Sequence, residues 1–462
     1  MTQHLWSGRF DSTPDPAAFD FGVSFRFDRR LFEDDVTGSL AWAEALVTAG
    51  VLTADDGRAI HDALVRLLQQ AREDPSWVSG PDEDVHSFVE RQLIARLGDA
   101  GRRLHTGRSR NEQVSLDLRL YLRRRIPLLQ DSLRAVVGAL ADQAEAAGNA
   151  LMPSYTHLRR AMPVLVAHYF LSHTAALRRD VERLTNASRE ADAMPLGSGA
   201  IAGTAYAVDV NALARRLGFS RVVSNSIDAA SDRDFVASFL YACALAMVHL
   251  SRLAEDLILF TSEEFGFFDL ADRTATGSSM MPQKKNPDPL ELVRGKAGRT
   301  VGHLTGLMTT MKGLPTGYNK DLQEDKEPVF DAEDTLAVSA GAAAAVVKHL
   351  TLQAERTRLA ASGLLLATDV ADYLVGRGIP FRQAHEIVGA MVRRLVDANR
   401  DFESLTLQEW QAFSDRFGDD VREAIRPEAS VRARRTPQST QPDAVRLALA
   451  ETRAWLAAER AS

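Results

Sequence analysis

The stretch from residue 276 to 299 concentrates side chains that could bind an anion and move a proton. Its first half reads TGSSMMPQKKNPDP, and glycine, serine and proline at this density exclude a regular helix or a central strand, so we predict a loop. From Leu290 to Arg299, leucine, valine and charged residues recur at helical spacing. The loop is therefore expected to lead into a helix whose first turn carries Asp288 and Glu291.

Three polar side chains of this loop suit a carboxylate ligand. Ser278, Lys284 and Asn286 supply a hydroxyl, a cation and an amide beside a helix N-terminus, which itself favours anions. Met280 and Met281 would flank them with apolar surface. A solvated basic loop is the default interpretation of a short charged run, but functional groups at this density favour a binding site.

Two further polar loops carry groups of the same kind, HTGRSRN at residues 105–111 and YTHLRR at residues 155–160. Arginine binds carboxylates through two parallel hydrogen bonds, while hydroxyl and amide groups fix the orientation of the ligand. A substrate with several carboxylates is the simplest ligand that would use all three loops. The eleven histidines include no HExxH pair, and the sequence has neither a P-loop nor a GxGxxG pattern. We therefore expect acid–base chemistry with no metal and no cofactor.

β-Elimination fits these groups. Removing a proton next to a carboxylate builds negative charge on that carboxylate, which Lys284 and Asn286 are suited to stabilise. His157 is a natural acid for the leaving nitrogen, with Glu291 as a carboxylate that could orient it. Ser278 could act as the base if backbone N–H groups, Lys284 and a helix N-terminus stabilise its alkoxide.

Several of these polar residues have a plain structural alternative. Asp82 or Asp84 could cap the helix that follows, an interpretation favoured about two to one because aspartate is a preferred N-cap. Thr156 could be another helix cap, and Tyr318 a buried phenol with a hydrogen-bond partner. The glycine-rich segment PLGSGAIAG at residues 195–203 is expected to be a structural turn. Taken singly, such alternatives are favoured; only the coincidence of several motifs outweighs them.

Long helical patterns dominate the middle of the chain. The clearest runs from Asp232 to Phe265, where apolar residues between Phe235 and Phe260 form one stripe at spacings of three and four. A second pattern spans Val164 to Leu184. A third begins at Glu112 and is expected to break at Pro127. The segment ALMPSYTHLRRAMP is expected to be a loop, since strand signals are scarce in this sequence.

These patterns predict an all-α fold in three parts. A helical N-terminal domain would occupy residues 1–108, a central bundle of long helices residues 109–359, and a small helical C-terminal domain residues 360–462. Helices such as FLYACALAMVHL are apolar on more than one side, which is typical of helices that are buried or shared between subunits. We therefore predict an obligate helical-bundle oligomer. A single thick bundle within one subunit is the alternative.

Composition excludes several classes of protein. The 462 residues carry 55 Lys and Arg against 62 Asp and Glu, a net charge of −7, so no basic excess points to nucleic acid or to an anionic membrane. The single cysteine, Cys243, lies on an apolar helical stripe and allows no disulfide within the chain. The polar N-terminal sequence does not resemble a signal peptide, and no apolar run has the length of a membrane span. We expect a soluble, cytoplasmic protein.

The motif GSSMMPQKKNP resembles the signature loop of the fumarase and aspartase superfamily, whose members release fumarate from substituted succinates. Within that superfamily the chain is most similar to the argininosuccinate lyase family, through HTGRSRN, YTHL, PLGSGAIAG, SDRDFVASF and YNKDLQEDKE as well as the loop itself. The resemblance covers nearly the whole chain. It implies cleavage of argininosuccinate to arginine and fumarate through an aci-carboxylate intermediate, the last step of arginine biosynthesis.

The resemblance also implies roles for individual residues. Ser278 would be the base and His157, with Glu291 as its partner, the acid or part of the acid's relay. The substrate-binding positions would be Ser24, Arg110, Asn111, Thr156, Tyr318, Gln323 and Lys326. The family's all-helical homotetramer has a shared central bundle, and each of its active sites would take loops from three subunits.

The chain departs from the family pattern at a few positions. Arg159 and Met162 stand where glutamine is usual, Glu112 where aspartate is usual, and residues 438–441 replace a glycine-rich segment. The changes beside His157 put the local hydrogen bonding in doubt, though not the class of reaction. The alternatives are another fumarate-releasing lyase of the superfamily, a non-catalytic structural homologue, and a helical scaffold for binding.

Overall fold

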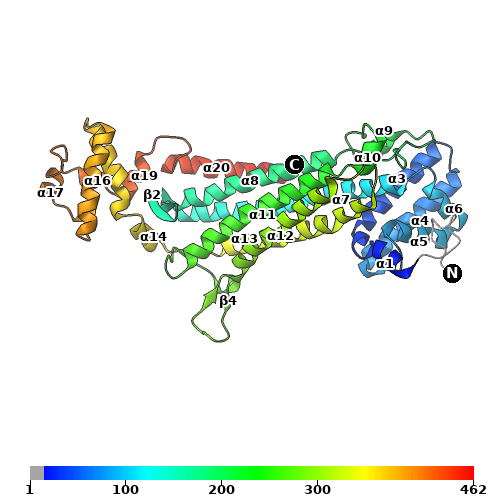
Figure 1. The fold of residues 1–462 in the computed structure, drawn as a ribbon, viewed down its shortest axis with the longest axis horizontal. Coiled ribbons are helices and arrows are strands. Elements are labelled where there is room, and N and C mark those ends of the chain that lie inside the picture. The colour runs from blue at the N-terminus through cyan, green and yellow to red at the C-terminus, as the bar shows by residue number, and fades with distance from the viewer. Residues whose placement is uncertain (1–14, 462) are drawn as a thin grey trace. The chain divides into compact units, whose positions relative to one another are not determined.

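The computed structural model describes residues 15–461, and helices make up most of this part of the chain (Figure 1). Its strands form three two-stranded antiparallel ladders, which pair β1 with β2, β3 with β6 and β4 with β5. The predicted all-α class is confirmed. The long helices are α7 (Arg110–Ala147), α8 (Val166–Ala191), α11 (Asp234–Thr261), α12 (Asp288–Met311) and α13 (Lys326–Lys348).

The chain divides into two compact units. Unit 1 runs to Gln130 and adds Glu182–Leu245 and Gly298–Leu336, while unit 2 comprises Asp131–Val181, Ala246–Ala297 and the chain from Ala337 onward. The boundaries between the units fall inside the five long helices. The division into three domains at residues 108 and 359 stays a prediction.

In unit 1, α3 (Phe32–Thr48), α4 (Ala54–Glu73) and α5 (Val85–Leu97) pack against one another around Trp42 and Phe88, which are fully buried. The start of α5 matters for the site. Asp84 caps this helix by accepting a hydrogen bond of 2.8 Å from the Ser87 backbone N–H. The predicted capping role of Asp84 is thus confirmed.

The break expected at Pro127 was wrong, because α7 runs through this residue without interruption. A proline inside a helix removes one hydrogen bond and disturbs the preceding turn. Here Leu122, Ile126, Leu129 and Leu133 are buried on either side of it. Their burial in the core outweighs that local cost.

Two other helix boundaries differ from the predicted ones. The helix expected over residues 232–265 is α11, Asp234–Thr261. It starts later because the Asp232 carboxylate accepts a hydrogen bond from the Asp234 N–H and so caps it. The helix expected from Val164 to Leu184 is α8, which begins two residues later and continues to Ala191.

The segment ALMPSYTHLRRAMP is a β-hairpin, so the predicted loop was wrong. Strands β1 (Leu151–Thr156) and β2 (Arg159–Leu165) pair antiparallel in unit 2. Their turn lacks the glycine or asparagine by which such turns are recognised in a sequence. Burial of Leu151, Met152 and Leu165 stabilises the hairpin against the neighbouring helices.

The C-terminal part of unit 2 has its own hydrophobic cluster. Leu374 of α15 (Ala367–Gly376) and Met391 of α16 (Phe381–Asp397) pack there with Trp410. The last helix, α20 (Pro442–Ala461), lies beside the long helices of unit 2 in Figure 1, where Arg453 pairs with Asp142 at 2.6 Å.

The expectation that no apolar run has the length of a membrane span was wrong for α11. Within the described part of the chain, it is the one helix that by itself is long and apolar enough to cross a membrane. Its side chains at Phe235, Phe239, Cys243 and Leu250 are fully buried, as in the core helix of a bundle. The predicted burial of Cys243 on this stripe is confirmed.

Candidate active site

The hairpin of unit 2 presents His157 at its tip. Thr156 pairs with Arg159, so His157 and Leu158 form a two-residue turn, and both have positive φ, 54° and 55°. Such a backbone costs a non-glycine residue about 1–2 kcal/mol. His157 and Leu158 are exposed to solvent, as is Thr156, so no packing of the two strained side chains compensates for this cost.

An aromatic cluster anchors the hairpin. The ring of Tyr155 lies 5.7 Å from that of Phe260, 5.8 Å from Phe265 and 6.4 Å from Phe267. Aromatic pairs at these distances add to the free energy of burial. The cluster therefore holds the strand that carries Thr156, and His157 after it, against the end of α11.

The signature loop of unit 2 lies between two very short strands, β4 (Thr276–Gly277) and β5 (Lys285–Asn286). Gly277 pairs with Lys285, so Ser278 and Lys284 leave the ladder at the same end. In Figure 1 this loop projects away from the long helices. The predicted loop is confirmed, with the short ladder as its root.

Ser278 Oγ accepts hydrogen bonds from two backbone N–H groups, those of Met280 at 3.2 Å and Met281 at 3.0 Å. Donors fixed in this way would stabilise negative charge on the oxygen. Backbone N–H groups were among the stabilising elements expected around Ser278. Lys284, which follows the tip of the loop, is exposed to solvent.

Helix α12 follows the loop, and its first turn carries Asp288 and Glu291, as predicted. Thr276 Oγ1 donates to Asp288 at 2.5 Å and ties the loop to the helix. Glu291 lies 4.0 Å from Arg294. Within the described chain no hydrogen bond joins Glu291 to His157, so that pairing stays a prediction.

Unit 1 gathers a second group of polar residues. Ser24 Oγ donates to Asp28 at 2.5 Å, and the Val85 N–H donates to the other oxygen of Asp28 at 3.0 Å. Burial raises the pKa of Asp28 to about 6, although His86 and the Ser24 hydroxyl oppose this rise. The start of α5 therefore fixes Ser24 through Asp28.

The same helix start holds an arginine. Arg110, the first residue of α7, lies 3.0 Å from the carboxylate of Asp84. Asp84 thus caps α5 and orients Arg110 at once. Asn111 follows in the first turn of α7, where its N–H donates to Ser109 Oγ at 3.3 Å.

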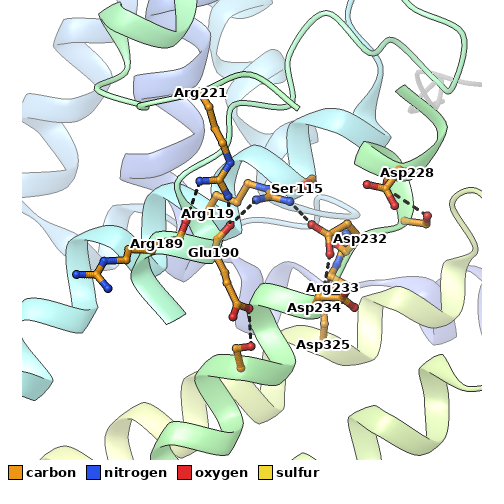
Figure 2. Close-up of polar contacts among 12 residues, drawn as sticks. Ser115, Arg119, Arg189, Glu190, Arg221, Asp228, Asp232, Arg233, Asp234 and Asp325 are labelled. Atoms are coloured by element: carbon orange, nitrogen blue, oxygen red, sulfur yellow. Dashed lines mark hydrogen bonds and ion pairs between the residues drawn. The ribbon is translucent and has the colours of Figure 1, made fainter. Parts of the chain in front are cut away.

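Arg233 and Asp325 form a buried ion pair (Figure 2), and Lys326 follows Asp325 in the sequence. Arg233 Nε donates to Asp325 at 2.5 Å, and Lys326 Nζ donates to the other oxygen of Asp325 at 2.8 Å. The side chains of Arg233 and Asp325 are both fully buried. Asp232, the residue before Arg233, binds the buried guanidinium of Arg119.

Tyr318 lies among these groups. Burial raises its pKa above the ordinary value, and the charges of Arg233, Asp325, Asp84 and Arg110 all act on it. The phenol is therefore close to both ion pairs.

Unit 1 thus brings together four of the predicted substrate-binding residues, Ser24, Arg110, Tyr318 and Lys326. The charges of Asp84 and Lys326 both act on the pKa of Asp28, so these groups lie in one neighbourhood. Gln323 lies in the short helix η6 (Lys320–Asp325), directly before Lys326.

A fully buried cluster beneath α5 was missed by sequence reasoning. His86 Nδ1 lies 2.9 Å from Asp35 and 3.5 Å from Asp117. Burial raises the pKa of Asp117 well above its ordinary value. The ligand atoms of the three residues lie within 4.8 Å of one another, a spacing that could admit a metal ion. Buried Arg108 and Gln113 already act on Asp35, so the cluster has internal partners for its charge.

Glu112 replaces the aspartate usual in the family and is fully buried. Its carboxylate accepts a hydrogen bond of 3.1 Å from the Ser109 N–H. Burial raises the pKa of Glu112 to about 7, with the backbone N–H groups of Ser109, Gly199 and Gly197 opposing this rise. The carboxylate lies near the glycine-rich turn, where Gly197 and Gly199 have positive φ, as a structural turn requires.

We expect the contribution of Glu112 to stability to depend on pH. A raised pKa means that folded Glu112 binds its proton more tightly than unfolded Glu112 does, so the free energy of unfolding falls as pH rises from 4.5 to 7. The loss is about 3 kcal/mol at most. Glu112→Gln cannot titrate, so urea denaturation should show the variant gaining stability relative to the parent over this range. A difference between the two proteins that stays constant with pH would contradict this expectation.

The fold is that of the fumarase and aspartase superfamily, and the family model described as Lyase matches residues 8–302. A second model, described as Argininosuccinate lyase C-terminal, matches residues 364–432. The chain belongs to the argininosuccinate lyase family.

Relatives of that name support the assignment. The chain is 48% identical over 442 residues to the argininosuccinate lyase of Roseiflexus castenholzii, a match that covers 96% of this chain and 97% of the relative. It is 46% identical to that of Moorella thermoacetica, with 98% of each chain covered. Among solved structures, EDDS lyase in complex with formate superimposes with a TM-score of 0.86 at 27% identity, covering 97% of this chain and 92% of that one. An EDDS lyase variant with bound fumarate gives 0.84 at 26% identity, with coverages of 98% and 92%.

Proposed function

We propose that this protein cleaves argininosuccinate to arginine and fumarate, in the last step of arginine biosynthesis. The observation that carries the proposal is identity of nearly half over almost the full length to proteins named argininosuccinate lyase. The two groups of site residues supply what a substrate with several carboxylates requires, since they present cations and hydroxyl groups on fixed elements.

The proposed mechanism is general acid–base elimination. Ser278 removes the proton next to a carboxylate, and the N–H groups of Met280 and Met281 stabilise its alkoxide. Lys284 and Asn286 stabilise the aci-carboxylate that forms. His157, oriented by Glu291, delivers the proton to the leaving nitrogen or relays it. No step in this sequence calls for a metal or a cofactor.

The proposed substrate-binding set comes from both units of the chain. Arg110 and Lys326 supply cations that Asp84 and Asp325 hold in place. Hydroxyl and amide groups complete the set. Its members are Ser24, Arg110, Asn111, Thr156, Tyr318, Gln323 and Lys326.

We further propose a cytoplasmic homotetramer whose active sites each take loops from three subunits. Exposed large apolar side chains on the long helices support such an assembly, because contact with another copy of the chain would bury them. They are Tyr241, Val301 and Met308 in unit 1 and Leu292 and Val338 in unit 2. The exposure of His157 at a hairpin tip is a second support, because a side chain placed there can reach another copy of the chain. With a net charge of −7, we propose neither a nucleic acid nor a membrane as a partner.

The substrate is tested by following fumarate through its ultraviolet absorbance. The purified protein should release fumarate from argininosuccinate and not from adenylosuccinate, aspartate or malate. Fumarate from one of the other three would keep the class of reaction and change the leaving group. No release of fumarate from any of the four compounds would favour a non-catalytic homologue.

A further inference from the structure

We propose that Lys285 is a positioning residue that fixes the root of the signature loop, so that Ser278 and Lys284 are held in their working places. The proposal rests on the role proposed above for Ser278. It concerns the second lysine of the KK pair, to which neither the sequence motif nor the proposed mechanism gives a task.

The Lys285 ammonium is bound on the side of the loop that faces the segment before it. Its Nζ donates a hydrogen bond of 2.7 Å to the backbone carbonyl of Leu270. It also lies 3.0 Å from the carboxylate of Asp272 and 3.5 Å from that of Asp269. Three oxygens of one short segment therefore surround the ammonium, one as a hydrogen-bond acceptor and two as ion-pair partners.

The backbone of Lys285 is part of the ladder that carries the catalytic groups. Lys285 pairs with Gly277, and the pair forms the last rung before the loop. Ser278 follows Gly277 directly, and Lys284 precedes Lys285 directly. A displacement of this rung would therefore move both groups at once.

Strand alternation gives Lys285 a second effect. Successive side chains of an extended chain point to opposite faces. When the Lys285 side chain is drawn toward Leu270, its strand neighbour Asn286 is directed to the other face. The anchor thus determines which way this proposed carboxylate-stabilising group points.

The loop has few other attachments. The contact between Thr276 and Asp288 ties its root to α12, and the hydrogen bonds of Ser278 lie within the loop itself. Met280 at the tip is 87% exposed. The contacts of Lys285 are therefore the attachment of this ladder to the 269–272 segment within the described structure.

An exposed ion pair without consequence is the competing interpretation, since most surface pairs contribute little to stability. The hydrogen bond to the Leu270 carbonyl favours the anchoring role of Lys285 over an exposed ion pair without consequence. Leu270 is buried and begins the turn between β3 (Phe268–Asp269) and β4, so its backbone is a fixed point. A hydrogen bond to a fixed carbonyl orients the ammonium in a way that two mobile carboxylates do not.

The test compares Lys285→Met with Lys312→Met, which removes an exposed lysine elsewhere in the chain. We expect Lys285→Met to lower kcat by about 10- to 100-fold, since misplacing a catalytic group by 1 Å has an effect of that order. KM and Tm should stay close to the parent values. Lys285→Arg should recover most of the lost kcat, because a guanidinium can still donate to Leu270, and Lys312→Met should match the parent.

Hydrogen exchange of residues 276–286 supplies a readout that does not depend on turnover. Exchange should be about tenfold faster in Lys285→Met than in the parent, because the ladder opens more often. A kcat within twofold of the parent, or an unchanged exchange rate, would overturn the proposal. If Ser278→Ala proved active, the role of the serine would fail, while the exchange measurement would still decide whether Lys285 anchors the loop. Should Lys285→Met not fold, Lys285→Gln also removes the ammonium and gives the same exchange measurement.

Discussion

Ser278→Ala is expected to abolish the release of fumarate, with a fall in kcat of at least about a thousandfold, because no other group stands in its place to take the proton. The alanine side chain lacks the oxygen that receives the N–H groups of Met280 and Met281. Ser278 lies on a loop rather than in the core, so Tm and the oligomeric state should not change. Steady-state kinetics measures kcat, and thermal denaturation of the same preparation measures Tm.

Ser279→Ala is the matched control, because it removes the neighbouring hydroxyl from the same loop. The structure records no hydrogen bond to the Ser279 side chain. This variant should keep kcat within about tenfold of the parent. Activity of Ser278→Ala at the level of Ser279→Ala would remove the serine from the role of base.

Arg233→Met is expected to have the largest effect on stability. The substitution leaves the carboxylate of Asp325 buried with Lys326 as its remaining partner. Removing one partner from a buried ion pair typically costs about 3–5 kcal/mol. Since Asp325 also orients Lys326, KM for argininosuccinate should rise together with the loss of stability. Urea denaturation and steady-state kinetics measure the two effects.

Arg221→Met serves as the control for this change. Arg221 lies in the same region (Figure 2), but it is exposed and donates only to backbone carbonyls, those of Arg189 and Glu190. Its loss should change the free energy of unfolding by less than about 1 kcal/mol. Equal destabilisation by the two substitutions would show that the buried pair of Arg233 and Asp325 contributes no more to the free energy of unfolding than the exposed Arg221 does.

Much of the fold could be predicted from the sequence, because long amphipathic patterns specify helices directly. The stripe from Phe235 to Phe260 located α11, and only its ends were misplaced. The hairpin of residues 151–165 was not foreseen, since the turn at His157 and Leu158 has positive φ without glycine or asparagine. Tertiary packing around Tyr155 stabilises what local preference does not indicate.

The candidate site was predicted in part, and the reason is sequence distance. The signature loop is one contiguous motif, so its hydroxyl, ammonium and amide groups could be read together. Arg233 and Asp325 are 92 residues apart in the sequence, and no local sequence pattern predicts their contact. The buried cluster around His86 escaped notice for the same reason, because its partners Asp35 and Asp117 come from two other helices.

A site assembled from several copies of the chain is tested most directly by mixing two inactive variants, His157→Asn and Ser278→Ala. If each site takes its histidine and its serine from different subunits, random tetramers should recover about a quarter of the parental rate of fumarate release, because each residue is intact with a probability of one half. Mass spectrometry of the mixture shows whether the subunits have exchanged. No recovery in a mixture whose subunits have exchanged would contradict shared sites and place both residues in the site of one chain.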